Sequence, residues 1–426
     1  MRSFRKSLAF ILALAVCLCL WPAAAFAEGK DVIVTGKETR ISQPDSPVLT
    51  FSSAAPFELS TANHTKNWNG IIEYSTDKVT WRVWDGTTTL VSRWHNNQER
   101  LYLRGSGNTR ISNGQEQRWV LDGIDHPAPN ASAKTTEEQT RGPKVSCTGN
   151  IEYLLHYHAV EAGNHPTMAA HCFDHLFYKC NALVKAPRLP AETLTPYCYS
   201  SMFGHCESLT IAPKLPAETL AEGCYEFMFM YCTSLKEAPE LPAETMADSC
   251  YSWMFHSCTA LEEAPVLAAT ELAEFCYEGM FYRCFSLRTA PDLPADVMKT
   301  SCYNMMFSDC TSLLEPPSLP SVELAPYCYA WMFQSCTSLY KLPALPAVDL
   351  PNGCYWHMFH WCRNIKLSEK ESEYYNIPYR IPISENVQSV GNNSVSWMFS
   401  QTGGPFLNTP ELDTVYYLHR SQGIVW

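Results

Sequence analysis

The sequence predicts an α+β fold in which a solenoid of short helix–strand coils follows a small antiparallel β-sandwich domain. Three observations support this prediction. Two series of cysteines recur with a period of 26 residues through the C-terminal part of the chain. Each unit joins a segment of helical periodicity to a short apolar run that contains prolines. The residues ahead of the repeats form short β-type runs separated by turn signals.

Composition places the chain among packed proteins. Its 426 residues are 46% hydrophobic and 17% charged, which excludes wholesale disorder. The net charge of −12 argues against a nucleic-acid partner, because binding a phosphate backbone requires clustered lysines and arginines.

Residues 1–27 are typical of a secretory signal peptide. Arg2, Arg5 and Lys6 form a basic start, Leu8–Leu20 is apolar, and Ala25–Ala27 supplies the small residues of a cleavage site. Cleavage after Ala27 removes three basic residues, so the mature chain would carry −12 − 3 = −15. We therefore expect a secreted or cell-surface protein without an integral membrane segment.

Two alternatives to simple cleavage remain open. A retained membrane anchor is one, although the apolar run is short for a spanning helix. Lipid attachment at Cys17 is the other, and the bulky Val16 ahead of it disfavours that interpretation.

The cysteines define eight repeats over residues 172–379. The first series is Cys172, Cys198, Cys224, Cys250, Cys276, Cys302, Cys328 and Cys354. The second series, eight residues later in each unit, is Cys180, Cys206, Cys232, Cys258, Cys284, Cys310, Cys336 and Cys362. Short units of this kind must stack to bury a core, and a period of 26 falls within that of leucine-rich repeats. The predicted fold is therefore a leucine-rich repeat solenoid.

Each unit is expected to hold one helix and one strand. At about 100° per residue, five apolar residues of one unit fall within an arc of roughly 140°, which predicts a short helix. These residues are Cys224, Tyr225, Met228, Phe229 and Cys232. The run Leu235–Leu241 predicts a strand that enters a turn, because Pro239 and Pro242 remove ladder donors.

The repeat unit resembles that of the BspA-type leucine-rich repeat surface proteins of anaerobic bacteria. The resemblance rests on Glu240-Leu241-Pro242-Ala243 through Met254-Phe255, and it extends over residues 147–426. The closing run Trp397–Pro410 also resembles the terminal half-repeat of that group. The resemblance implies a surface-exposed interaction module and no enzymatic activity.

The remaining segments complete the expected organisation. A β-sandwich-like module spans 28–123, a flexible connection 124–146, an N-terminal cap of the solenoid 147–171 and a C-terminal capping half-repeat 380–426. The cap is expected to begin with a strand over Cys147–Leu155. The strands expected in the module are Val48–Phe51, Gly70–Tyr74, Thr80–Trp84, Thr88–Val91, Leu101–Arg104 and Trp119–Leu121.

The regular cysteines are best explained as small buried core residues. Their spacing does not fit the closely spaced ligand pairs of zinc sites, and a helical step of eight residues spans about 12 Å, too far for a disulfide. A repeated apolar context raises a thiol pKa, which disfavours catalysis. The adjacent methionines and phenylalanines are likewise expected in the core. We found no enzyme motif and expect no cofactor or metal, so a hydrolase hidden in the β module is the remaining enzymatic alternative.

The variable repeat positions supply the candidate partner-binding residues. Aromatic residues three or seven positions after the first cysteine flank the buried arc, where they either contact a partner or fill space between coils. Acidic residues on the strand side form either a binding strip or a solvated face. The candidates are Phe227, Trp253, Trp331, Trp361, Glu237, Glu240, Glu262, Glu263, Asp292 and Glu315.

The predicted function is non-enzymatic binding or adhesion to a host protein, another cell or a surface glycan. The alternative is a carbohydrate-binding accessory protein in which the β module reads the glycan. Its stacking platform would consist of Trp68, Trp81, Trp84 and Trp94. Trp81 and Trp84 would point to opposite faces of one strand, so at most one of them would serve.

Overall fold

A computed structural model describes residues 46–124, 143–384 and 390–426. Residues Asp45–Trp426 form one compact unit. The predicted signal peptide and most of the predicted connection 124–146 lie outside the described residues. Within the described ranges, no helix has the length and apolar character needed to cross a membrane.

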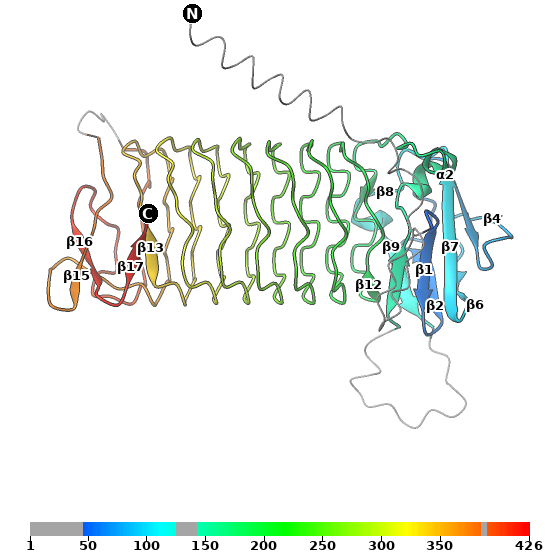
Figure 1. The fold of residues 1–426 in the computed structure, drawn as a ribbon, viewed down its shortest axis with the longest axis horizontal. Helices are drawn as coiled ribbons and strands as arrows, with labels where there is room; N and C mark the ends of the chain where they lie inside the picture. The colour runs from blue at the N-terminus through cyan, green and yellow to red at the C-terminus, as the bar shows by residue number, and fades with distance from the viewer. Residues whose placement is uncertain (1–45, 125–142, 385–389) are drawn as a thin grey trace, which may run out of the picture. The chain divides into compact units, whose positions relative to one another are not determined.

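Two sheets build the part of the unit that precedes the repeats (Figure 1). The larger sheet has the order β12-β10-β1-β7-β3-β4, with β6 also paired to β7. Its strands are β1 (Leu49–Ser53), β3 (Ile71–Ser75), β4 (Arg82–Val83), β6 (Arg93–His95), β7 (Gln98–Ser106), β10 (Val145–Thr148) and β12 (Leu183–Lys185). The smaller sheet consists of β5 (Leu90–Val91), β2 (Phe57–Thr61) and β9 (Trp119–Gly123). The short pair β8 (Ser112–Asn113) and β11 (Phe173–Asp174) and the 3₁₀ turn η1 (Gln115–Gln117) complete this part.

The predicted separate β-sandwich is wrong, because the larger sheet continues into the first repeat. Strand β10 pairs antiparallel with β1, Cys147 lying opposite Phe51, and it pairs parallel with β12 of the first repeat. The cores are also continuous, since the ring centroids of Phe51 and Phe177 lie 6.2 Å apart and those of Trp119 and Phe177 lie 6.0 Å apart. Strand β12 of the first repeat thereby covers the edge of β10 that would otherwise be unpaired.

The α-helix α2 (Tyr153–Glu161) packs against β7. Its approach is so close that a Cβ on Gly105 of β7 would lie 1.7 Å from the Leu154 carbonyl oxygen, which only glycine permits. Of the strand expected over Cys147–Leu155, only Cys147 and Thr148 are in a strand, β10 (Val145–Thr148). The helix begins at Tyr153.

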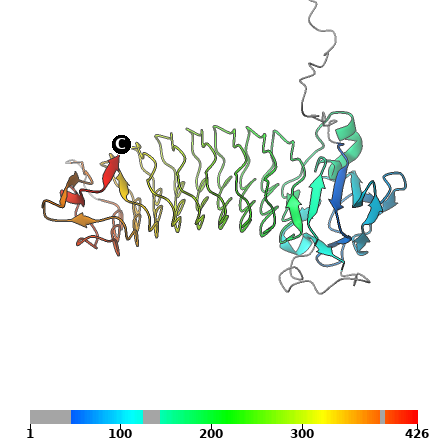
Figure 2. The same cartoon turned by 60° about the horizontal axis from the view of Figure 1, so that its bottom comes forward.

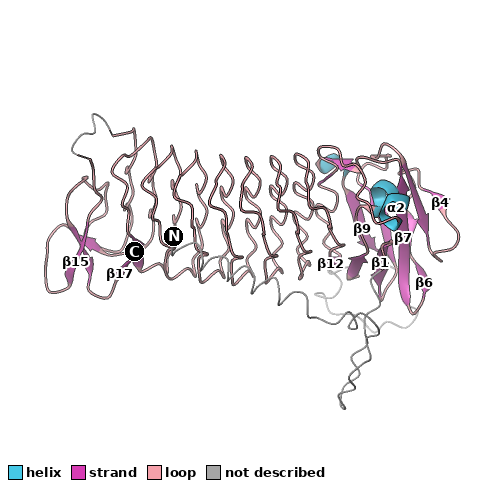
Figure 3. Ribbon diagram, turned by 45° about the horizontal axis from the view of Figure 1, so that its top comes forward, coloured by secondary structure: helices cyan, strands magenta, loops and turns pink. Residues whose placement is uncertain are grey.

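The predicted α+β leucine-rich repeat solenoid, with a helix and a strand in each coil, is wrong. Strands dominate the regular secondary structure of the described residues, and α2 precedes the repeats. Residues 172–362 consist mainly of turns and short extended segments, which Figure 3 shows as loops. The segment expected as a strand makes single parallel bridges to the next coil, such as Glu237 to Glu263.

The segment expected as a helix is a chain of overlapping turns. Alternate N–H groups bond within the coil and to the next coil: Met228 donates to the Tyr225 carbonyl at 3.2 Å, and Phe229 donates to the Met254 carbonyl at 2.9 Å. Every fourth residue has a positive φ, namely 55° at Gly223, 54° at Phe227 and 59° at Tyr231. The same pattern recurs 26 residues on, so backbone hydrogen bonds tie each coil to its neighbour. Figure 2 shows the successive coils side by side.

The physical reason for the error is a near-coincidence of two periods. The buried residues recur as adjacent pairs every four positions, as in Cys224-Tyr225 and Met228-Phe229. Over nine residues, a period of four and the helical period of 3.6 select almost the same positions. The core that they form is confirmed: phenylalanines of neighbouring coils stack in parallel with centroids 5.6–5.7 Å apart.

Short strands cover the last repeats. Strand β13 (Lys341–Pro343) pairs in parallel with β17 (Gly423–Val425). Strand β16 (Tyr416–His419) lies between β14 (Leu367–Ser368) and β15 (Tyr375–Tyr379). Leu367 and Leu418, opposite each other in this sheet, are fully buried, so the sheet extends the core of the last coil.

Candidate functional site

The turn segments carry aromatic side chains on the side that the core does not use. The first group, called here the first aromatic cluster, gathers rings from five consecutive coils. Its members are Tyr178, His205, Phe227, Tyr231, Trp253, His256 and Tyr282. Six of the seven are half-buried and Tyr178 is buried.

Contacts within the first aromatic cluster are continuous. The rings of His205 and Tyr231 stack with centroids 4.4 Å apart, and His256 lies 5.0 Å from Tyr231, 5.4 Å from Trp253 and 5.0 Å from Tyr282. These separations are those of favourable aromatic pairs. The predicted residues Phe227 and Trp253 meet here, with centroids 6.3 Å apart.

A second aromatic cluster lies on the last coils. Its members are Tyr327, Trp331, Trp356, His357, His360, Trp361 and Trp397. The rings of Trp331 and Trp356 are 4.2 Å apart, and His357 stacks between Trp331 at 5.6 Å and Trp397 at 6.4 Å. Trp361 is 46% exposed and Trp397 55% exposed, so this cluster presents large apolar rings to solvent. The predicted residues Trp331 and Trp361 both belong to it.

The histidines of the clusters are neutral at pH 7. Burial, together with the charge of Arg283, lowers the pKa of His256 to about 4. Burial also lowers the pKa values of His357 and His360. Both clusters therefore offer uncharged rings, which suits them to stacking rather than to ion pairing.

Part of the predicted acidic strip forms a row. Glu237, Glu263 and Glu315 occupy one column of bridged positions, which Thr289 interrupts between the last two. The Lys341 ammonium lies 2.7 Å from the Glu315 carboxylate, and with Tyr340 it lowers the pKa of that carboxyl.

The other predicted acidic residues do not join this row. Glu262 is exposed beside Glu263 on the same coil. Glu240 and Asp292 are exposed on the proline-containing segments of coils that lie two repeats apart, with Val266 at the equivalent position between them. The structure therefore brings together three of the six acidic candidates.

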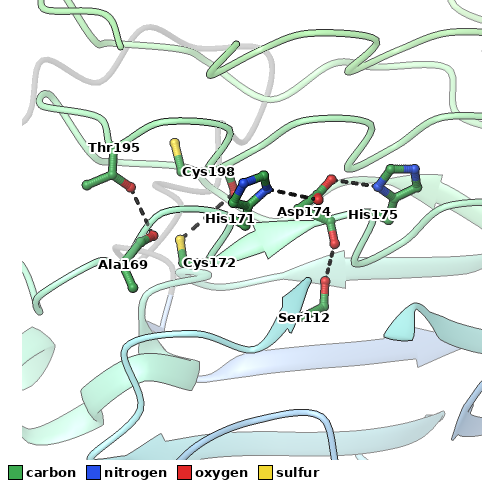
Figure 4. Close-up of polar contacts among 8 residues, drawn as sticks. All are labelled: Ser112, Ala169, His171, Cys172, Asp174, His175, Thr195 and Cys198. Carbon is green, nitrogen blue, oxygen red and sulfur yellow. Dashed lines mark hydrogen bonds and ion pairs between the residues drawn. The ribbon is translucent and has the colours of Figure 1, made fainter. Parts of the chain in front are cut away.

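A half-buried polar group lies at the start of the repeats (Figure 4). The Asp174 carboxylate contacts the Nδ1 atoms of His171 at 3.2 Å and of His175 at 2.6 Å, while the Ser112 hydroxyl donates to the Asp174 backbone carbonyl. Among the contacts of the described residues, neither imidazole accepts a hydrogen bond from a hydroxyl or a thiol. The group therefore lacks the nucleophile–base pair that covalent catalysis requires.

Glu226 carries a carboxylate at the repeat position equivalent to Asp174, two coils further on. Burial raises the pKa of Glu226 to about 7, and the negative charges of Asp174 and Glu278 contribute. Burial also raises the pKa of Glu278, whose carboxylate accepts a hydrogen bond from the Asn304 amide at 2.8 Å. Within the part of the chain that the structure describes, no three His, Cys, Asp or Glu side chains are grouped so as to hold a metal ion.

The predicted burial of the cysteines is confirmed. All sixteen repeat cysteines and Cys147 are free thiols with almost no exposed surface. Seven of the eight second-series thiols donate to a carbonyl of the preceding coil, as Cys258 does to Phe229 at 3.1 Å, and Cys180 donates to the Trp119 carbonyl of β9. Burial raises the pKa values of these thiols, for example that of Cys180 to about 12, so the nucleophilic thiolate is disfavoured.

The tryptophan platform proposed for the β module does not form. Trp68 and Trp84 are buried against each other with centroids 4.9 Å apart. The Arg104 guanidinium lies 4.2 Å from the Trp81 ring centroid. Trp94 is 65% exposed, so it alone of the four presents most of its ring to solvent.

Several members of the aromatic clusters were missed at the sequence level. His256, Tyr282 and His360 stand six positions after the first cysteine, and Trp356 stands two positions after it. The helical interpretation singled out only the positions three and seven residues after the first cysteine, so it did not select these residues. Aligning the repeats column by column would have found the aromatic residues that recur at the sixth position.

The comparisons with known proteins give no relative. Neither the protein-family models, nor the curated proteins, nor the solved structures contain a match to this chain.

Proposed function

We propose that the chain is an exported, non-enzymatic binding protein that adheres to a host protein, another cell or a surface glycan through its aromatic clusters. The second aromatic cluster carries this proposal. It combines four tryptophans with two neutral histidines on adjacent coils, and Trp361 and Trp397 are about half exposed. Exposed apolar groups of this kind mark interaction surfaces, and tryptophan dominates binding hot spots.

The repeat backbone fixes where these rings lie. Trp361 and Trp397 occupy left-handed positions, with φ angles of 62° and 57°, and the equivalent positions of the other coils have the same geometry. The resemblance of the repeat unit to bacterial surface proteins and the signal-like residues 1–27 agree with this proposal.

The chemistry of the described residues favours binding over catalysis. The thiols are buried and protonated, and the Asp174–histidine group has no nucleophile. The β module as a glycan reader is less favoured, because Trp68 and Trp84 fill the core. Trp94 is the residue through which that alternative can be tested.

The test uses residues 28–426 and point substitutions. Truncation before residue 147 is unsuitable, because β10 pairs with β1 and its removal from the sheet would disturb the protein. The mature chain is screened against immobilised matrix proteins and glycans. The double variant W361A/W397A and the matched control W94A are then compared by surface plasmon resonance.

We expect the double variant to weaken binding by about 30-fold or more, as loss of a hot spot does, and W94A to leave it unchanged. Loss of binding in W94A alone would transfer the function to the β module. A folded mature chain that binds no matrix or glycan component at micromolar concentration would contradict the proposal.

A further inference from the structure

Two arginines of the β module have no anionic partner. Arg82 of β4 and Arg93 of β6 are both exposed, and neither has an ion pair or a side-chain hydrogen bond among the described residues. Arg110, Arg288 and Arg363 also lack a side-chain partner among the described residues, whereas Arg104 pairs with Glu73 at 2.7 Å. What distinguishes Arg82 and Arg93 is that they line the same cleft.

Both arginines line one cleft of about 290 Å³, called here the arginine cleft. Thr76 and Thr89 also line it, and their hydroxyls have no partner among the described residues. Guanidinium and hydroxyl donors that share a cleft form a set suited to an oxyanion.

The single carboxylate of this lining is engaged elsewhere. Asp77 Oδ1 accepts hydrogen bonds from the Ser75 hydroxyl at 2.8 Å, the Val79 N–H at 2.8 Å and the Thr80 N–H at 2.7 Å. These bonds hold a tight turn, and no oxygen of Asp77 lies within ion-pair distance of either arginine. Asp77 therefore does not pair with the two arginines in the way that a bound anion would.

A third arginine increases the local positive charge. Arg93 lies directly opposite Arg100 of β7 in the register of the sheet. Like charges at such positions destabilise a sheet. The nearby Glu99 carboxylate accepts a hydrogen bond from the Ser92 hydroxyl at 2.9 Å. A bound anion would offset this repulsion.

We propose that the arginine cleft binds the oxyanion group of a small polar molecule, such as a carboxylate, sulfate or phosphate, through Arg82 and Arg93. Its volume is at the small end of ligand sites, which fits a single ion or one sugar acid rather than a polymer. The site is independent of the aromatic clusters and of the adhesive function proposed above.

Isothermal titration calorimetry of residues 28–426 tests this site. Sulfate, phosphate and glucuronate are titrated separately at constant ionic strength, which is maintained with sodium chloride. The variants are R82Q and R93Q. R288Q is the matched control, because Arg288 is also an exposed arginine but lies on the repeats.

We expect at least one oxyanion to bind with a stoichiometry of one, and each cleft variant to weaken that binding about tenfold. The lysine variants R82K and R93K keep the charge and are expected to restore part of the affinity, since they lose only the planar fork. The ligand that binds most tightly identifies the oxyanion. Absence of binding by all three, or equal weakening by R288Q, would overturn the proposal.

Discussion

The left-handed turn positions predict opposite effects for two substitutions at equivalent sites. Gly223 and Ser249 stand one residue before the first cysteine of neighbouring repeats, with φ of 55° and 54°. Gly223→Ala is expected to destabilise the protein, and Ser249→Gly is expected to stabilise it. The pair is informative because a helix at this segment would penalise glycine at both sites.

The magnitude of the Gly223→Ala effect follows from two contributions. Alanine at residue 223 would have to keep the left-handed backbone conformation, which costs a residue with a Cβ about 1–2 kcal/mol. It would also lie 2.2 Å from the Tyr197 ring, which must move and give up its 2.6 Å hydrogen bond to Glu222. That displacement adds about 1 kcal/mol, so we expect a total loss of about 2–3 kcal/mol.

Ser249→Gly removes the strain without removing a side-chain contact of comparable size. Against this gain stands the greater backbone freedom of glycine in the unfolded chain, so the net gain is up to about 1 kcal/mol. Urea denaturation followed by far-UV circular dichroism compares the midpoints, since stacked repeats need not unfold in two states. Equal midpoints for Gly223→Ala and wild type, or a lower midpoint for Ser249→Gly, would refute the turn geometry.

Four further predictions concern charge and thiols. The pKa of Glu226 is raised by burial from 4.5 to about 7, so the folded state holds a proton that the unfolded state releases, and stability falls as the pH rises between these values. Glu226→Gln should therefore stabilise the protein by about 1–2 kcal/mol at pH 8, after allowance for partial exposure, which raises the urea midpoint at pH 8 but not at pH 4. A thiol reagent such as DTNB at pH 8 should label almost none of the buried cysteines of native protein comprising residues 28–426, and all of them in denaturant. Cys258→Ala removes the thiol hydrogen bond to Phe229 and should cost about 1 kcal/mol in the same denaturation assay. Lys341→Met breaks the exposed ion pair with Glu315 and should lower the urea midpoint only slightly, an effect that 1 M salt should remove.

Local patterns in the sequence predicted much of the β module. Each of the six expected strands overlaps an observed strand, as Val48–Phe51 does with β1 and Leu101–Arg104 does with β7. Alternation of apolar residues and turn signals are local properties, so they can be read from one stretch of chain. Pairing of β10 with both β1 and β12 is non-local, and nothing in the run around Cys147 specifies it.

The repeats show the same limit in another form. The burial of the cysteines, methionines and phenylalanines was predicted correctly, because burial depends on the apolar pattern. The backbone was predicted incorrectly, because that pattern fits a helix and a four-residue turn equally well. Glycines offered a signal that was not used: Gly223 and Gly353 stand before the first cysteine, and Gly279 stands four positions later in the unit. Their spacing matches the left-handed residues of the turns.

The candidate site was predicted only in part, for the same reason. Phe227, Trp253, Trp331 and Trp361 all belong to aromatic clusters. Their neighbours in those clusters come from other positions of adjacent coils, and the distance between coils is a property of the stack. A single unit cannot reveal which columns meet.

The turn geometry also connects the fold with the proposed binding role. Trp253, Trp331, Trp361 and Trp397 all have left-handed φ angles, between 53° and 62°, although glycine or asparagine would adopt them at lower cost. Hydrogen bonds between coils fix the backbone at these positions whatever the side chain, so the repeats tolerate the strain. Because the core needs only the paired cysteine, tyrosine, methionine and phenylalanine positions, the left-handed residues are free to vary. Tryptophan at these positions places a large ring outside the core, where the binding role proposed above requires it.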